Sequence, residues 1–103
     1  MPRGYWIAHI DVSDPEGYKS YISANAIALA RFGGKFLVRG GKSETVEGQA
    51  RSRHVVIEFP SYEDALACYR SPEYAEALAH RLDASEGDVI LVEGYEGSQP
   101  EAR

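Results

Sequence analysis

Three side chains with acid, base or anion-binding chemistry occupy similar positions in segments typical of β-strands. His9, Arg39 and Glu58 lie in stretches rich in β-branched and aromatic residues, and each falls in the same alternation class of its strand. An imidazole and a carboxylate in a partly dry cavity can act as general acid and base, because burial and mutual charge shift both pKa values. His9 and Glu58 are therefore the candidate catalytic residues, with a structural ion pair as the alternative.

Arg39 is the candidate anion-binding residue. A planar guanidinium can bind a carboxylate or an enolate through two parallel hydrogen bonds. The alternative is a cross-strand salt bridge with Glu58. If the first strand lies beside the third and the third beside the second, His9, Arg39 and Glu58 should converge on one face of the sheet. Arg53 and Arg81 are lesser candidates, which we interpret as surface charges.

The sequence contains seven tyrosines, and a phenol suits the wall of an aromatic ligand pocket because it has an apolar ring and a polar tip. Tyr5, Tyr18 and Tyr74 are the candidate ligand-binding tyrosines. Tyr18 and Tyr69 lie at helical spacing, which is also the pattern of core residues. Tyr5, Tyr74 and Tyr95 can equally belong to a subunit interface.

No residue pattern predicts a metal or cofactor site. His9, His54 and His80 are spread over two strands and a helix, without the spacing of zinc ligands. A single histidine can still ligate heme, which is the alternative that remains. Cys68 lies among apolar residues of a predicted helix, so we interpret it as a buried, inert thiol. We expect no metal and no cofactor.

The composition limits the class of protein and its partners. With 103 residues, 44% hydrophobic and 26% charged, the chain fits one globular domain, expected at 1–96 and followed by a polar tail at 97–103. The net charge of -5 and the scattered basic residues disfavour nucleic acid and anionic membranes as partners. The single cysteine and the lack of an apolar leader or a long apolar run favour a cytoplasmic protein.

The periodicity predicts the element order β-α-β-β-α-β. Gly40 and Gly41 interrupt the second strand, so one of them should have a positive φ angle or mark a bulge. The strands are expected at 5–12, 35–46, 51–59 and 88–95, and the helices at 14–32 and 61–84.

Short motifs predict where the helices begin. Ser13 or Asp14 followed by Glu16 is typical of a capping box. Ser61 followed by Asp64 predicts a second one. The Ser-Pro pair at 71–72 should kink or split the second helix, because proline fits the first turn of a helix and disrupts its interior.

This element order is the split β-α-β arrangement of a ferredoxin-like α+β fold. Right-handed crossovers then give an antiparallel sheet in the order 4-1-3-2, with the helices on one face. One alternation class of the strands is almost wholly apolar, should lie under the helices, and includes Phe36, Val38, Ile90 and Val92. The other class is left uncovered and mixes polar residues with the aliphatic residues Ile7, Leu37, Val56, Val89 and Leu91.

The uncovered aliphatic residues predict a homodimer. Burying each of them contributes roughly 1.5–3 kcal/mol, or about 7–15 kcal/mol together. That sum rivals the net stability of a whole domain, about 5–15 kcal/mol. We therefore expect a second copy to cover this face, so that two sheets form a dimeric barrel.

Four segments resemble the bacterial domain-of-unknown-function family 1330, which belongs to the dimeric α+β barrel superfamily. They are YWIAHIDVSDPEGY, FGGKFLVRGG, RHVVIEFPSYEDALACYRSPEY and DVILVEGY, and the resemblance runs from Gly4 to Gly94. It implies a homodimer of ferredoxin-like subunits. It implies no particular reaction, since relatives across the superfamily include cofactor-independent monooxygenases, isomerases, heme-handling proteins and ligand binders.

Two classes of function agree with these residues. The first is a cofactor-independent enzyme that acts on a small carboxylated or aromatic molecule by proton transfer or oxygen addition. The second is a dimeric protein that binds a similar molecule without catalysis, or has a purely structural role. A ligand-sized opening lined by His9 and Arg39 favours the first. A closed interface with those groups paired to each other favours the second.

Overall fold

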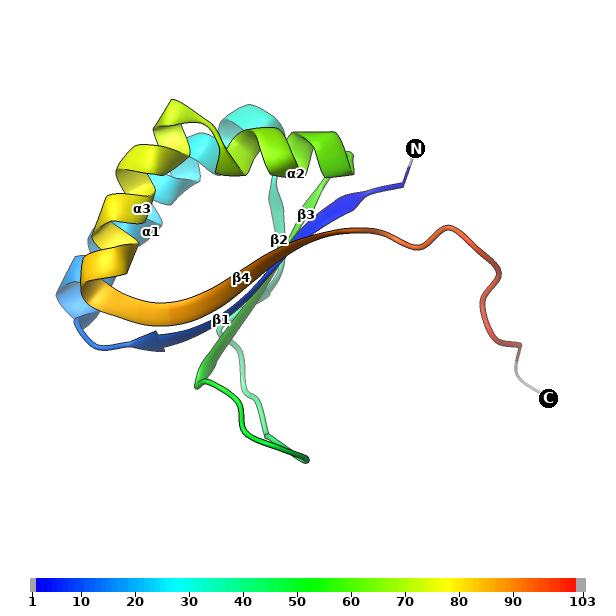
Figure 1. Ribbon diagram of the computed structural model, residues 1–103, viewed down its shortest axis with the longest axis horizontal. Coiled ribbons are helices and arrows are strands. Elements are labelled where there is room, and N and C mark those ends of the chain that lie inside the picture. Colours follow the sequence, from blue (N-terminus) through cyan, green and yellow to red (C-terminus); the bar gives the residue numbers. More distant parts are fainter. Residues whose placement is uncertain (1, 102–103) are drawn as a thin grey trace.

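Three helices cover one face of a four-stranded antiparallel sheet in the computed structural model, which describes residues 2–101 (Figure 1). The sheet order β2-β3-β1-β4 confirms the predicted order 4-1-3-2 and the ferredoxin-like α+β class. None of the described helices is long and apolar enough to cross a membrane. The elements are β1 (Gly4–Val12), α1 (Pro15–Phe32), β2 (Lys35–Arg39), β3 (Arg53–Phe59), α2 (Tyr62–Tyr69), α3 (Pro72–Ala84) and β4 (Ser85–Glu93).

Serine side chains begin two of the helices. Ser61 Oγ accepts a hydrogen bond from the backbone N–H of Asp64 at 3.1 Å, which confirms the N-cap half of the predicted capping box. The Asp64 carboxylate accepts from the Ser61 hydroxyl at 3.0 Å rather than from the Ser61 backbone N–H that a full capping box uses. Ser71 Oγ accepts from the backbone N–H of Tyr74 at 3.1 Å. The predicted split before Pro72 is therefore confirmed, and it separates α2 from α3.

The capping box predicted for the first helix is wrong. Asp14 is the N-cap residue of α1, but its side chain makes no capping hydrogen bond. Ser13 Oγ donates instead to the carbonyl of Ala84 at 3.1 Å, which ties the start of α1 to the end of α3. The serine hydroxyl thus bonds to a residue distant in the sequence instead of capping its own helix.

Replacing Ser61 by alanine is expected to lower the free energy of unfolding by about 1 kcal/mol, because the backbone N–H of Asp64 at the start of α2 loses its side-chain acceptor. Urea unfolding measures this. The control is Ser20→Ala, since Ser20 is exposed within α1 and should change stability by less than about 0.5 kcal/mol. Equal effects of the two substitutions would contradict the capping role.

Trp6 is the centre of the core between sheet and helices. Its indole N–H donates to the carbonyl of Ala65 at 2.8 Å, so the buried donor is satisfied. The rings of Phe59, Tyr69 and Tyr74 lie 5.2, 5.7 and 4.8 Å from it, centroid to centroid. These contacts hold β1 and β3 against α2 and α3.

A bulge in β2 reverses the side-chain alternation after Phe36. Phe36 pairs with Ile57 and Arg39 pairs with Val55, although an unbroken strand would put positions 36 and 39 on opposite faces. The register shifts by one residue between Phe36 and Val38, which is the signature of a bulge. Since directly opposed residues share a face, Arg39 lies on the helix-covered face and Val38 on the uncovered one. Both assignments differ from the sequence prediction.

The two faces of β4 are also the reverse of those predicted. Leu91 pairs with the buried Trp6, so Leu91 and Val89 lie under the helices. Ile90 and Val92 lie on the uncovered face and are 55% and 39% exposed. Because the run VILV is apolar at every position, its pattern does not determine which residues point toward the helices.

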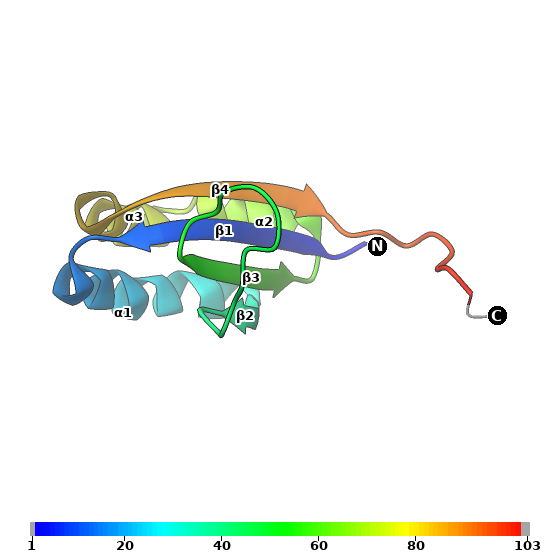
Figure 2. The ribbon, with the colours of Figure 1, turned by 90° about the horizontal axis from the view of Figure 1, so that it is seen from below.

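The uncovered face carries a continuous aliphatic row, as the sequence led us to expect, although partly from other residues. Ile7 is directly opposite Val56 on β3 and Ile90 on β4, and Val56 is directly opposite Val38 on β2. The row therefore crosses all four strands at one level. Figure 2 shows this face, with β1 between β3 and β4.

A loop at 40–52 takes the place of the predicted continuation of the second strand. β2 ends at Arg39 and β3 begins at Arg53, so the expected strand through Val46 is wrong. Gly40 has φ 65°, which confirms the predicted positive φ, and its N–H donates to the carbonyl of His54 at 2.8 Å. The loop projects from the sheet on the side away from the helices (Figures 1 and 2).

Candidate functional site

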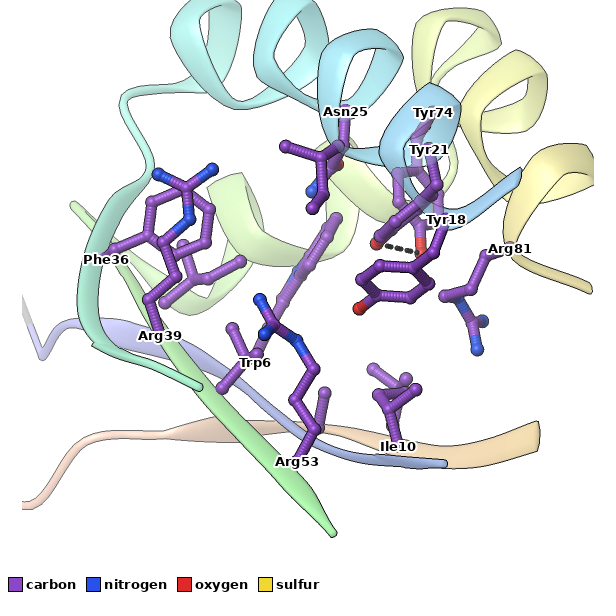
Figure 3. Close-up of a pocket in the computed structure, with 15 residues that line it drawn as sticks. Trp6, Ile10, Tyr18, Tyr21, Asn25, Phe36, Arg39, Arg53, Tyr74 and Arg81 are labelled. Carbon is purple, nitrogen blue, oxygen red and sulfur yellow. Dashed lines mark hydrogen bonds between the residues drawn. The ribbon is translucent and has the colours of Figure 1, made fainter. Parts of the chain in front are cut away.

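A cavity lies between the helix layer and the covered face of the sheet (Figure 3). Residues from α1, α3 and all four strands line it. The space open to water inside it is about 30 Å³. One water needs about 10–15 Å³ on this measure, so there is room for about two. Its aromatic walls are Trp6, Tyr18, Tyr21, Phe36 and Tyr74. These walls suit a flat occupant, although a ring needs more room than the space for about two waters.

Three guanidinium groups line this cavity. They belong to Arg39 on β2, Arg53 on β3 and Arg81 on α3, and Arg81 is only 6% exposed. None of the three makes an ion pair with a carboxylate in the described part of the chain. No Asp, Glu or His from that part lines the cavity. Three guanidiniums without carboxylate partners make the cavity positive in a chain of net charge -5, and such a cavity attracts anions.

Aromatic rings and one glycine position the two arginines on the strands. The guanidinium carbon of Arg39 lies 4.0 Å from the centroid of the Phe36 ring, and that of Arg53 lies 5.4 Å from the Tyr18 ring. Such distances permit cation–π attraction. Gly40 lies against Arg53, and a methyl group there would overlap Nη1 of the guanidinium. The bulge and the positive φ that follows it thus bring both arginines to the cavity.

Two phenols and the third arginine form a buried polar group in the cavity. The hydroxyls of Tyr21 and Tyr74 are 3.1 Å apart, and the guanidinium carbon of Arg81 lies 5.9 Å from the Tyr21 ring centroid. Burial, more than any other cause, raises the pKa of both phenols. Both therefore keep their protons at neutral pH. One O–H donates to the other, which leaves the second proton free for a ligand.

Polar atoms without partners are concentrated here. Asn25 Oδ1, Arg53 Nε and Arg81 Nε are buried without a hydrogen bond, and they make up three of the four such side-chain atoms in residues 2–101. Leaving a buried donor or acceptor unpaired costs about 1–3 kcal/mol. Water or a ligand usually satisfies such groups. An occupant of the cavity, water or ligand, can therefore supply the missing partners.

The structure brings together some of the predicted site residues and separates others. Arg39, Tyr18 and Tyr74 all line the cavity. His9 and Glu58 lie on the opposite, uncovered face, where they pair with residues of the neighbouring strands. The predicted convergence of His9, Arg39 and Glu58 is therefore wrong, because the bulge in β2 turns Arg39 to the covered face.

On the uncovered face, the two residues of the predicted acid–base pair, His9 and Glu58, each contact other residues instead of one another. Nδ1 of His9 lies 2.8 Å from Nδ1 of His54. Glu58 accepts a hydrogen bond from the hydroxyl of Tyr5 at 3.2 Å and lies 3.8 Å from Nε of Arg3. His9 and Glu58 do not contact each other, because the aliphatic row separates the two pairs. The alternative salt bridge between Glu58 and the β2 arginine does not form either.

The interpretation of Arg53 and Arg81 as surface charges is wrong. Arg53 has the same alternation as the buried Val55, and Arg81 comes four and seven residues after the buried Ala77 and Tyr74 of α3. These spacings already place both guanidiniums on core-facing positions. A charged residue at such a position is the signal that sequence reasoning could have used.

Among residues 2–101, neither the cysteine nor a cluster of metal-binding side chains is arranged for chemistry. Cys68 is fully buried, which confirms the predicted burial, and this burial raises the pKa of its thiol to about 12, in agreement with an inert cysteine. Among residues 2–101, no group of three or more His, Cys, Asp or Glu side chains is placed to hold a metal ion. The helix–sheet cavity is thus the candidate site.

The split β-α-β topology, the helices on one face and the cavity beneath them define a ferredoxin-like α+β protein. The chain belongs to the family described as "Domain of unknown function (DUF1330)", whose family model matches residues 3–95. This confirms the resemblance drawn from the sequence. No curated protein matches the chain.

Solved structures with low sequence identity have the same fold. RPA0582 of Rhodopseudomonas palustris, in its methylated form, is 20% identical with a TM-score of 0.74, covering 95% of this chain and 84% of that one. SnoaB of Streptomyces nogalater, a cofactor-independent oxygenase, is 14% identical with a TM-score of 0.63, covering 98% and 100%. A dimeric ferredoxin-like protein of unknown function from Thermobifida fusca is 16% identical with a TM-score of 0.60, covering 89% and 91%.

Proposed function

We propose that the chain binds a small carboxylated molecule with a flat, aromatic body in the helix–sheet cavity and acts on it as a cofactor-independent enzyme. The observation that carries this proposal is the set of three guanidiniums without carboxylate partners in one cavity with aromatic walls. A carboxylate supplies the missing negative charge and the missing hydrogen-bond acceptors. The aromatic rings supply flat surfaces for stacking.

The chemistry that these groups support is stabilisation of an anion. Guanidiniums and neutral phenols near a reacting atom favour an enolate or a phenolate over its neutral form. An enolate or phenolate formed there, with its proton passed to water, is the electron-rich species that can react with dioxygen or take up a proton at carbon. That SnoaB, with the same fold, is described as a cofactor-independent oxygenase agrees with this class of reaction.

Binding without catalysis is the second candidate, and one observation favours it. Among the described residues, no His, Asp or Glu lines the cavity, so no side chain there is an obvious general base. A protein that only binds or carries an acid needs none. Turnover of a bound acid, followed by NMR, separates the two candidates.

We also propose that two copies pair through the uncovered sheet face, in a bacterial cytoplasmic protein. The aliphatic row of Ile7, Val38, Val56 and Ile90 supports this, since apolar patches of this kind mark interfaces. The Thermobifida fusca protein of the same fold is described as dimeric. In such a dimer the cavity stays on the far side of each sheet from the interface.

Benzoate is expected to raise the melting temperature of the protein, whereas benzamide, its neutral counterpart of the same shape, is not. A ligand at 100 times its Kd stabilises the folded state by about 2.7 kcal/mol. Thermal unfolding measures the shift, and calorimetric titration gives the Kd. The same comparison with acetate and acetamide covers ligands without a ring. Equal shifts for the acids and the amides, or no shift for any acid, would overturn the proposal.

A further inference from the structure

The polar groups of the cavity form an outer end and a deep end. Arg39 is exposed and Arg53 is half-buried, and these two arginines from neighbouring strands define the outer end. The deep end consists of Asn25, Tyr21, Tyr74 and Arg81, of which Arg81 is 6% exposed and Asn25 is 5% exposed. In Figure 3 the Trp6 and Tyr18 rings lie between the Arg39 and Arg81 side chains. A flat molecule held beside the Trp6 and Tyr18 rings would have the arginines of the outer end at one edge and the polar groups of the deep end at the other.

The deep end contains both unpaired donors and an unpaired acceptor. Arg81 Nε has no acceptor, and the Tyr21–Tyr74 pair leaves one phenolic O–H without one. Asn25 Oδ1 has no donor. A carboxylate accepts hydrogen bonds only, so it cannot satisfy the Asn25 oxygen. A hydroxyl can donate to that oxygen and accept from the phenol of Tyr21, one turn away on α1.

The geometry points to a ligand that carries a carboxylate at one end and a hydroxyl at the other, on a flat ring: a hydroxylated aromatic acid. The carboxylate binds the arginines of the outer end, and the hydroxyl occupies the deep end. This inference rests on the proposed function, because it assumes that the cavity holds an acid. It adds the second functional group and the direction in which the molecule lies.

The cavity also disfavours larger or less polar occupants. Its free space holds about two waters as it stands, so a single ring can enter only when the exposed Arg39–Phe36 pair at the outer end moves aside. An acid without a hydroxyl would leave Asn25 Oδ1 unpaired in a buried position, and a buried polar group without its partner is costly. The deep end therefore selects for the hydroxyl rather than merely tolerating it.

The experiment compares 3- and 4-hydroxybenzoate with the matching methylbenzoates, in which a methyl group of similar size replaces the hydroxyl. Calorimetric titration of the wild-type protein should show at least one hydroxybenzoate binding about ten-fold or more tightly than its methyl counterpart. Asn25→Leu should bring this ratio close to one while methylbenzoate binding is retained. Ala26→Leu, at the exposed neighbouring position, is the matched control and should keep the wild-type ratio.

A purely structural role for Asn25 gives a different result. If Asn25 serves the ligand, Asn25→Leu should melt at the wild-type temperature or above it without ligand, because an unpaired buried polar group has been removed. A clear fall in melting temperature with an unchanged ratio would overturn the inference. Should this variant not fold, the double substitution Tyr21→Phe and Tyr74→Phe replaces it, since loss of both phenolic O–H groups removes the free donor and must also lower the ratio.

The outcomes separate this inference from the function on which it rests. If hydroxybenzoates and methylbenzoates bind the wild-type protein equally well, the hydroxyl-selective deep end is wrong while the acid-binding cavity stands. If neither the benzoates nor acetate bind, the proposed function is wrong as well. If the wild-type protein prefers the hydroxybenzoate about ten-fold or more, and only substitutions in the deep end remove this preference, both the hydroxyl-selective deep end and the acid-binding cavity are supported.

Discussion

Replacing Val56 by aspartate is expected to convert the proposed dimer into folded monomers. Val56 lies within the aliphatic row, directly opposite Ile7 and Val38. An unpaired carboxylate buried in a packed interface costs about 3–5 kcal/mol, which corresponds to a rise in the dimer dissociation constant of roughly 10²- to 10³-fold or more. Sedimentation equilibrium at micromolar concentration should report about 11.4 kDa for the variant and about twice that mass for the wild-type protein.

The matched control places the same charge at an exposed apolar residue on the other side of the molecule. Ile27 on α1 is 66% exposed, so Ile27→Asp should leave the dimer intact. Ile90→Asp, at the β4 end of the row, should act like the Val56 variant. Circular dichroism has to show that each variant is folded. A wild-type protein that stays monomeric and folded, or a Val56→Asp protein that stays dimeric, contradicts the proposed interface.

The order of the elements was predictable because its signals are local and each has a physical cause. Ser61 and Asp64 cap a helix with their own side chains, and Pro72 can only begin one, so the boundaries of α2 and α3 follow from short motifs. The sheet order then follows from general rules of chain crossing rather than from any particular residue. This part of the prediction is confirmed.

The sequence did not predict which face of the sheet the side chains of β2 and β4 point to, and the reason differs from that for the element order. In KFLVR, either register gives each face of the sheet an apolar side chain, so only pairing with β3 reveals the extra residue between Phe36 and Val38. In β4 the run VILV is apolar at every position, so no alternation of polar and apolar residues shows which side chains are buried. The error at Arg39 is the important one, because a single inserted residue moves the guanidinium from one face of the sheet to the other.

The candidate site was predictable in part. Tyr18, Tyr74 and Arg39 were identified by chemistry alone and do line the cavity, although Arg39 was assigned to the other face. Arg53 and Arg81 were missed because charged residues are usually exposed, and that general tendency outweighed their core-facing spacing. The burial of an unpaired charge is a departure from the rule for stable packing, and such departures are expected at functional sites.

Replacing Arg53 by methionine is expected to weaken benzoate binding by about 10- to 150-fold, since a hydrogen bond to a charged group contributes about 1.5–3 kcal/mol. Methionine keeps an unbranched apolar side chain, and no ion pair is lost because Arg53 makes none in the described chain. Urea unfolding without ligand should therefore show little loss of stability. Arg51→Met is the control: Arg51 pairs with Asp11 and Asp88 and lines no part of the cavity, so benzoate affinity should not change.

Gly40→Ala tests the same guanidinium without removing it. The added methyl group would overlap Nη1 of Arg53, and φ at Gly40 is 65°, a conformation that alanine adopts only with strain. We expect benzoate affinity to fall in the same direction as for Arg53→Met, together with a loss of stability of about 1 kcal/mol. Gly41→Ala is the control, because a methyl group there meets no atom within 4 Å, and its affinity should equal that of the wild-type protein. If the Gly40 and Gly41 variants bind benzoate equally well, the placement of Arg53 by the start of the 40–52 loop does not matter for the anion.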